Sequence, residues 1–242
     1  MVATHAVRWA RMAGVLYLAI IVLGVWSEGF VRSRVIVANE PATTAANILA
    51  SIGAFQASLV ADSVMLLCDV ALAVLLFVLL EPVNRVLAMM AAAFRLVQAA
   101  VLGVNLLNQQ VALTLLSPSS EGGALVGSTR DGLVLLFAQT QDHGYDLGLL
   151  FFGINCVITG YLVFKSGFLP RVVGVLVAVS GPVYLAGSYL SLLSPHRAAV
   201  FDAAYLLPLV AELSFCLWLL MKGVNGDAWR TRARRSTDQE PS

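Results

Sequence analysis

Three ionisable residues lie deep inside long apolar stretches of this 242-residue sequence, and they are the first candidates for chemistry. Arg95 interrupts the run MMAAAFRLVQAAVLG, while Asp69 and Glu212 stand in two other apolar runs. Counted from the nearest flanking charge along a helix, each would lie roughly 15–18 Å from the same side of a membrane. A charge near the bilayer centre costs about 2.5–3.5 kcal/mol, so it needs a partner. The sequence therefore predicts that Arg95 pairs with Asp69, with Glu212, or with both.

This predicted ion pair has two interpretations. It can be a structural clamp that fixes the register of neighbouring helices without any chemistry. It can also belong to a polar site, because Gln98 and Asn105 lie close to the helix face that carries Arg95. The planar guanidinium group suits such a site, since it binds carboxylate or phosphate groups through two hydrogen bonds.

A second group of polar residues is expected nearer the opposite surface of the membrane. Asp62 lies seven residues before Asp69, on the same helix face, and Glu28 lies at the end of the first apolar run. The stretch QDHGYD supplies His143 and Asp146. These positions fall about 25–30 Å from the inner edge, at the outer interface. We expect an outward-facing polar cleft with His143 and Asp146 at its mouth and Arg95 at its floor.

The candidate ligand-binding residues share a polar side chain at membrane depth: Arg95, Asp69, Asp62, Glu28, His143, Asp146, Glu212, Gln98 and Asn105. Such a cleft would bind or move a membrane lipid or another small amphipathic molecule. One alternative is a non-catalytic scaffold or partner subunit whose charges only hold the bundle together. Another is an intramembrane enzyme acting on a lipid, with Asp62, His143 or Asp146 as acid or base.

Other kinds of chemistry find little support in the sequence. Of the three histidines, only His143 has carboxylates close by, whereas His5 and His196 stand apart. The motifs HExxH, GxSxG, Walker A and GxGxxG do not occur, so we predict no catalytic residues, no metal and no cofactor. The three cysteines are far apart and indicate no disulfide framework. A net charge of +1 gives no basic field for nucleic acid.

The elements that must position these residues are membrane-spanning helices. Hydrophobic residues make up 59% of the chain and charged ones only 12%, against about 25% charged residues in soluble domains. A helix of about 20 apolar residues crosses the bilayer core. We predict an all-α bundle with six transmembrane helices, near residues 12–30, 58–80, 86–116, 145–164, 172–193 and 199–221. Residues 1–222 would form a single domain, and residues 223–242 a disordered basic cytoplasmic tail.

Orientation follows from the distribution of positive charges. With the N-terminus inside, ten of the fifteen lysines and arginines fall on cytoplasmic segments and four on outer ones. Both termini are therefore expected in the cytoplasm.

Two segments are not predicted to span. NEPATTAANILASIGAFQ indicates an amphipathic helix on the outer surface, and Asp131–Gln141, after the flexible SPSSEGG, would be either interfacial or re-entrant.

Four stretches carry a resemblance to a known family: RMAGVLYLAIIVLG, EPVNRVLAMMAAAFRLVQAAVLGVNLL, DHGYDLGLLFFGINCVITGYLVFKSGFLPRVVGVL and YLAGSYLSLL. Together, over about residues 8–221, the chain resembles a bacterial integral-membrane family known as domain of unknown function 4386. The resemblance implies a multi-pass protein of the bacterial cytoplasmic membrane. The family has no established activity, so it assigns no functional residue.

The expected partners are membrane lipid, a small amphipathic molecule, and a second copy or another membrane protein, but not nucleic acid.

Overall fold

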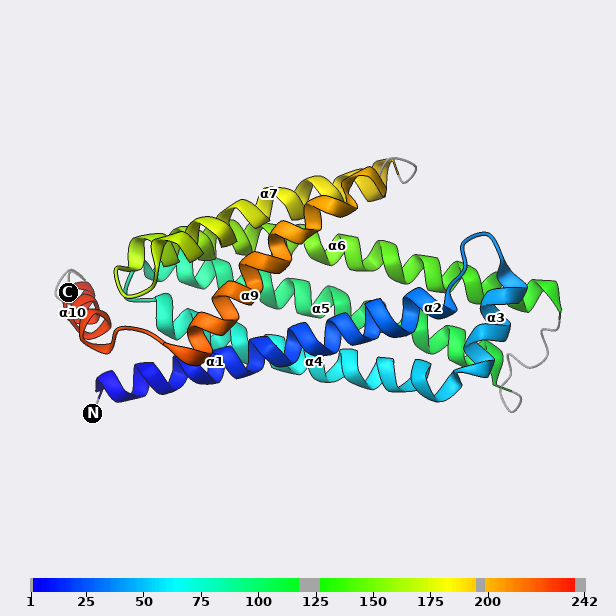
Figure 1. The fold of residues 1–242 in the computed structure, drawn as a ribbon, viewed down its shortest axis with the longest axis horizontal. Helices are drawn as coiled ribbons and strands as arrows, with labels where there is room; N and C mark the ends of the chain where they lie inside the picture. The colour runs from blue at the N-terminus through cyan, green and yellow to red at the C-terminus, as the bar shows by residue number, and fades with distance from the viewer. Residues whose placement is uncertain (1, 118–126, 195–198, 238–242) are drawn as a thin grey trace. The chain divides into compact units, whose positions relative to one another are not determined.

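The computed structural model describes residues 2–117, 127–194 and 199–237, and all regular structure in these ranges is helical (Figure 1). The elements, in chain order, are α1 (Val2–Val25), η1 (Trp26–Arg32), α2 (Ser33–Val35), α3 (Pro41–Ala50), α4 (Ile52–Leu80), α5 (Arg85–Leu116), α6 (Ser128–Ser166), α7 (Arg171–Leu193), η3 (Ala199–Tyr205), α9 (Leu206–Met221) and α10 (Gly226–Thr237). The predicted all-α class is confirmed.

Six helices in the described residues are long and apolar enough to cross a membrane: His5–Val35, Ile52–Leu80, Arg85–Leu116, Ser128–Ser166, Arg171–Leu193 and Ala203–Met221. Large apolar side chains on these helices are exposed, for example Leu67, Val104 and Val172. Exposed apolar surface on this scale needs a non-aqueous environment, and lipid supplies it. The prediction of six spans is therefore confirmed.

The chain divides into two compact units. Unit 1 comprises Met1–Ala19, Cys68–Ala99 and Asp146–Ser242, and unit 2 comprises Ile20–Leu67 and Ala100–Tyr145. The helices α1, α4, α5 and α6 each contribute residues to both units. The single domain expected for residues 1–222 stays a prediction, as does the orientation in the membrane.

Close helix packing in unit 1 depends on glycine. α6 and α7 approach through Gly160 and Gly174, where a Cβ added to Gly174 would lie 2.6 Å from the backbone nitrogen of Phe164. α1 approaches α9 in the same way, since a Cβ on Gly14 would lie 2.6 Å from the backbone nitrogen of Leu220. Small residues let membrane helices pack backbone to backbone, which replaces the hydrophobic driving force that lipid removes.

Unit 2 contains the amphipathic helix that the sequence predicts between the first two spans. α3 begins at Pro41, a residue suited to the first helical turn because it lacks an N–H group that would need a partner. Its residues Ala45 and Ile48 are buried in an apolar cluster with Phe55 of α4. This face of α3 thus packs on the protein, and its predicted location at the outer surface stays a prediction.

The structure corrects the interpretation of residues 131–141. They are neither a separate interfacial segment nor a re-entrant one, because they form the first part of the continuous 39-residue helix α6. No proline interrupts this stretch, so the backbone hydrogen bonds continue through QDHGYD. The fourth span thus begins at Ser128 rather than near Tyr145, and α6 is about 58 Å long.

One further expectation is corrected at the end of the chain. The predicted disorder of residues 223–242 does not hold for Gly226–Thr237, which form α10. This helix is ordered because Asn225 Oδ1 accepts a hydrogen bond from the Ala228 N–H and Trp229 is buried. The predictions that concern His196 and most of the SPSSEGG loop lie outside the described residues.

Candidate functional site

The predicted buried ion pair of unit 1 is present. Arg95 donates from Nε to Asp69 Oδ1 at 2.8 Å and from Nη2 to the same oxygen at 2.5 Å. Both residues are only 3% exposed. Asp69 is the partner of Arg95, whereas Glu212 accepts a hydrogen bond from the hydroxyl group of Tyr184. The pair joins α4 to α5 near the middle of two spans.

Aromatic rings enclose the guanidinium group of Arg95. Its Cζ lies 5.3 Å from the ring centre of Tyr17 and 5.1 Å from that of Phe152. Both contacts are within the range of cation–π attraction. Beside Arg95 is a cavity of about 10 Å³, lined mostly by alanine and leucine, which is room for about one water molecule. Arg95 is therefore held in place, and its surroundings favour the clamp over a ligand-binding fork.

Two other candidate residues of unit 1 have different environments. Gln98 is buried, and its Oε1 has no hydrogen-bond partner among the described residues. Asp146 is half-buried and accepts a hydrogen bond from Ser191 Oγ at 2.5 Å. The latter contact joins α6 to α7. Neither residue lines the cavity beside Arg95.

A second buried ion pair occurs in unit 2, and its arginine was not among the predicted site residues. Arg32 Nη1 donates to Asp62 Oδ2 at 2.5 Å, and Arg32 Nε donates to Glu28 Oε2 at 2.8 Å. Arg32 and Asp62 are 4% and 3% exposed, while the Glu28 side chain is 55% exposed. The i,i+4 spacing of Glu28 and Arg32 was a usable signal in the sequence. In the charge distribution that predicts the orientation, Arg32 is one of the four positive charges on outer segments.

Local backbone geometry places Arg32 against α4. Residues Trp26–Arg32 form the π-helix η1, a wider turn that is often found at functional sites. Ser27 lies in the same segment and donates from Oγ to the Ser58 carbonyl of α4 at 3.3 Å. These contacts hold the end of the first span to α4, so Arg32 and Asp62 meet in the interior of unit 2.

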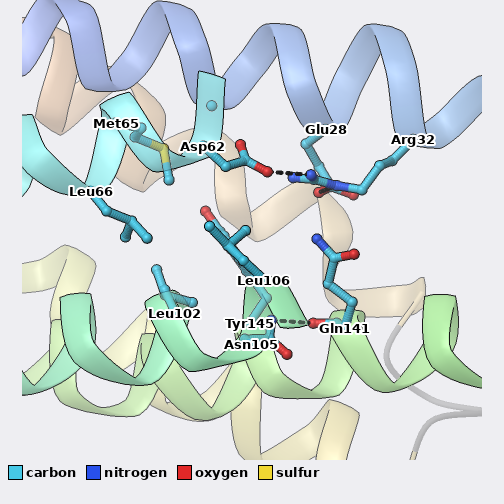
Figure 2. Close-up of a pocket in the computed structure, with 11 residues that line it drawn as sticks. Glu28, Arg32, Asp62, Met65, Leu66, Leu102, Asn105, Leu106, Gln141 and Tyr145 are labelled. Carbon is cyan, nitrogen blue, oxygen red and sulfur yellow. Dashed lines mark hydrogen bonds and ion pairs between the residues drawn. The ribbon is translucent and has the colours of Figure 1, made fainter. Parts of the chain in front are cut away.

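A pocket lies next to this ion pair, entirely within unit 2 (Figure 2). Its lining residues are Gly24, Glu28, Arg32, Asp62, Met65, Leu66, Leu102, Asn105, Leu106, Gln141 and Tyr145. The enclosed cavity is about 20 Å³, and the total space between the atoms is about 370 Å³ when the open side is included. One oxygen of Asp62 accepts from Arg32, while the other, Oδ1, is buried without a partner among the described residues.

The wall opposite Asp62 is a hydrogen-bonded network. Asn105 Nδ2 donates to the Gln141 carbonyl at 2.8 Å, as Figure 2 shows. Gln109 Nε2 donates to the Phe55 carbonyl at 2.9 Å and so links α5 to α4. Gly144 makes room for Asn105, since a Cβ there would lie 2.9 Å from Asn105 Nδ2. The network fixes the polar side of the pocket on three helices.

The structure thus distributes the predicted site residues differently from the expected single cleft. Glu28, Asp62 and Asn105 come together at the pocket of unit 2. The side chain of His143 is exposed and does not line that pocket. The remaining candidates, Arg95, Asp69, Gln98, Asp146 and Glu212, belong to unit 1. A cleft with His143 and Asp146 at its mouth and Arg95 at its floor is not supported.

Metal-binding side chains do not come together in the part of the chain that the structure describes. Within residues 2–117, 127–194 and 199–237, no three His, Cys, Asp or Glu side chains are grouped so that they could hold a metal ion. The pocket of unit 2 has two carboxylates, but Arg32 already neutralises one of them. In this pocket, Asp62 can accept hydrogen bonds from a neutral or a positively charged group.

Six apolar helices and two buried arginine–carboxylate pairs define this chain as a multi-pass α-helical membrane protein. Within that class, the chain belongs to the family described as Domain of unknown function (DUF4386), whose model matches residues 12–223. It is also similar to an uncharacterized protein of Archaeoglobus fulgidus, with 28% identity over 167 residues, which cover 69% of this chain and 83% of that protein. No solved structure matches the chain.

Proposed function

We propose that this membrane protein binds a small amphipathic ligand in the pocket of unit 2, with the polar group of the ligand at Asp62. The observation that carries the proposal is the Oδ1 atom of Asp62, which lines a pocket and has no partner among the described residues. A buried acceptor without a hydrogen bond costs about 1–3 kcal/mol. A ligand that donates a hydrogen bond to this oxygen would recover that free energy.

The charge of the pocket indicates the sign of the ligand. Arg32 contributes one positive charge, and Glu28 and Asp62 contribute two negative charges, so the lining carries a net charge of −1. A primary ammonium group offers three hydrogen-bond donors and neutralises this charge. An anionic headgroup would instead meet two carboxylates, and it would find the guanidinium group already bound to both of them.

The apolar lining indicates the rest of the ligand. Met65, Leu66, Leu102 and Leu106 contribute apolar side chains to the lining, against which an alkyl chain would be removed from water. Methionine adapts its shape readily to a bound group. The enclosed cavity of about 20 Å³ holds only about one or two water molecules, so a ligand enters through the open side of the pocket and displaces side chains. A short single-chain amphiphile therefore fits better than a two-chain phospholipid.

Three six-carbon probes of equal chain length test this proposal: hexylamine, hexanol and hexanoate. We expect hexylamine to raise the melting temperature of the full chain most, hexanol less and hexanoate least, at matched ionic strength. Stabilisation by binding reaches about 2.7 kcal/mol at a ligand concentration of 100 times Kd. The proposal fails if none of the three probes stabilises the wild type more than a variant with a filled pocket.

Leu106→Trp is that variant, because Leu106 lines the pocket. Leu107→Trp is the matched control, since Leu107 is the next residue of α5 and is 61% exposed. We expect the response to hexylamine to disappear in the first variant and to persist in the second. If Leu106→Trp does not fold, Leu106→Phe provides a smaller obstruction, for which we expect a partial loss of the response.

A scaffold or partner subunit is the second candidate function, and the environment of Arg95 favours it. Arg95 is enclosed by Asp69, Tyr17 and Phe152, as expected for a group that only fixes helix register. This candidate predicts that no small amphiphile stabilises the protein through either polar site.

The location that we propose for both candidates is the cytoplasmic membrane of a bacterium.

A further inference from the structure

The helix α10 is fixed to the end of α4 in unit 1. Trp229 is 7% exposed, and its indole Nε1 donates to the carbonyl of Leu79 at 2.9 Å. The backbone N–H of Asn225 donates to the carbonyl of Phe168 at 3.2 Å. These two contacts tie the start of α10 to two neighbouring span ends. Figure 1 shows α10 at the same end of unit 1 as the first turns of α1.

The composition of α10 is strongly basic. It contains Arg230, Arg232, Arg234 and Arg235 but only one acidic residue, Asp227. At 100° per residue, Arg230 and Arg234 lie one turn apart on one flank of the face that Trp229 buries. Arg232 and Arg235 lie on the other flank. The helix is therefore amphipathic, with an anchoring tryptophan and arginines on both sides of it.

One of these arginines has a donor that lacks an acceptor. The Nε atom of Arg230 is buried and has no hydrogen-bond partner among the described residues. A buried N–H of a charged group calls for an acceptor, and a negatively charged oxygen is the strongest. Leu79 is the penultimate residue of a membrane-spanning helix, so a helix fixed to it lies at the level of lipid headgroups.

We propose that Arg230 and Arg234 bind the phosphate group of an anionic phospholipid in the leaflet next to α10. The two guanidinium groups can share one phosphate, because residues four apart on a helix are neighbours. Trp229 holds the helix in the headgroup layer, where a basic amphipathic helix is stable. This proposal does not depend on the pocket of unit 2, since it rests on other residues and another ligand.

Soluble short-chain lipids test the proposal with the full chain in a neutral detergent. We expect dioctanoyl phosphatidylglycerol to raise the melting temperature at lower concentration than dioctanoyl phosphatidylcholine, and inorganic phosphate to have no effect. In R230Q/R234Q, apparent affinity for phosphatidylglycerol should fall about 30-fold, since each direct hydrogen bond from an arginine to the phosphate contributes roughly a factor of five. The response to phosphatidylcholine should not change.

The matched control is R232Q/R235Q, which removes the same charge from the other flank of the same helix. We expect it to weaken phosphatidylglycerol binding less than about fivefold, because these two arginines make no direct contact with the phosphate and their longer-range attraction to it is screened by salt. Equal losses in the two double variants would overturn the site, because they would show diffuse attraction. An equal effect of both lipids on the wild type, or stabilisation by inorganic phosphate alone, would also overturn it. If R230Q/R234Q does not fold, Arg230→Lys keeps the charge but removes Nε, and phosphatidylglycerol affinity should still fall severalfold.

Discussion

Arg95 of α5 donates two hydrogen bonds to a single carboxylate oxygen of Asp69 of α4, from Nε at 2.8 Å and from Nη2 at 2.5 Å. The other oxygen of Asp69 has no partner among the described residues. The guanidinium group contacts the rings of both Tyr17 and Phe152. This arrangement connects four spans, those that contain α1, α4, α5 and α6, through one charged side chain.

Removing one partner of this pair should destabilise the protein strongly. We expect Arg95→Leu to lower the free energy of unfolding by about 3–5 kcal/mol, because Asp69 is left as a buried, unpaired charge. The double variant Arg95→Leu/Asp69→Leu should lose much less of the free energy of unfolding, because no unpaired charge is left. Unfolding in detergent, followed by intrinsic fluorescence, measures both. Arg85→Leu is the control, since its side chain is 64% exposed and its ion pair with Glu81 should contribute at most about 1 kcal/mol.

The two carboxylates that share Arg32 should differ in their contribution to stability. Asp62→Ala leaves a buried guanidinium group with one partner fewer, and we expect a loss of about 3 kcal/mol or more. Glu28→Ala should cost less than about 1 kcal/mol, because the Glu28 side chain is 55% exposed and water can replace it. Thermal unfolding of the two variants under one condition tests this. Equal losses would show that burial does not decide the strength of these ion pairs.

The contact between α6 and α7 should not accept a side chain. A Cβ on Gly174 would lie 2.6 Å from the backbone nitrogen of Phe164. We therefore expect Gly174→Ala to lower the free energy of unfolding by about 1–3 kcal/mol through overpacking. Gly132→Ala in α6 is the matched control, because a Cβ there meets no atom within 4 Å. That control should stabilise the helix by about 0.5–1 kcal/mol, the usual difference between glycine and alanine.

Membrane orientation can be tested with single cysteines in a variant that lacks Cys68, Cys156 and Cys216. We expect Glu40→Cys, in the loop before α3, to react with an impermeant maleimide in intact cells. Lys165→Cys, in the last turn of α6, should react only after the cells are lysed. Both positions are exposed in the structure, so a difference in labelling reports the side of the membrane. The reverse pattern would contradict the orientation predicted from the positive charges.

The sequence by itself determined the fold class, because run length and composition are local properties. A stretch long enough to cross the bilayer is visible without any knowledge of its neighbours. Depth along a helix is equally local, at 1.5 Å per residue. This is why Arg95 and Asp69 could be matched before their contact was seen. The short turn EPVNR made their two helices adjacent in the chain, and the observed pair confirms the prediction.

Secondary structure near the span ends was harder to predict. The continuation of α6 through residues 131–141 depends on the absence of a helix break. By itself this apolar stretch is too short to span, so the sequence predicted an interfacial or re-entrant segment there. The order of α10 depends on Trp229 donating to Leu79, a contact between residues 150 positions apart. Hydropathy cannot show such a contact, because a polar stretch beside a membrane looks the same whether or not it is docked.

The polar sites were decided only by the tertiary structure. Arg32 lies at the end of a span, where an arginine is normally solvated, yet the π-helix and α4 bury it against Asp62. His143 is close in sequence to Gln141 and Tyr145, but it lies on another face of α6 and does not line the pocket. Sequence gives the position of a residue along its helix. The direction of its side chain depends on how each helix rotates to pack against its neighbours, and that rotation is a property of the whole bundle.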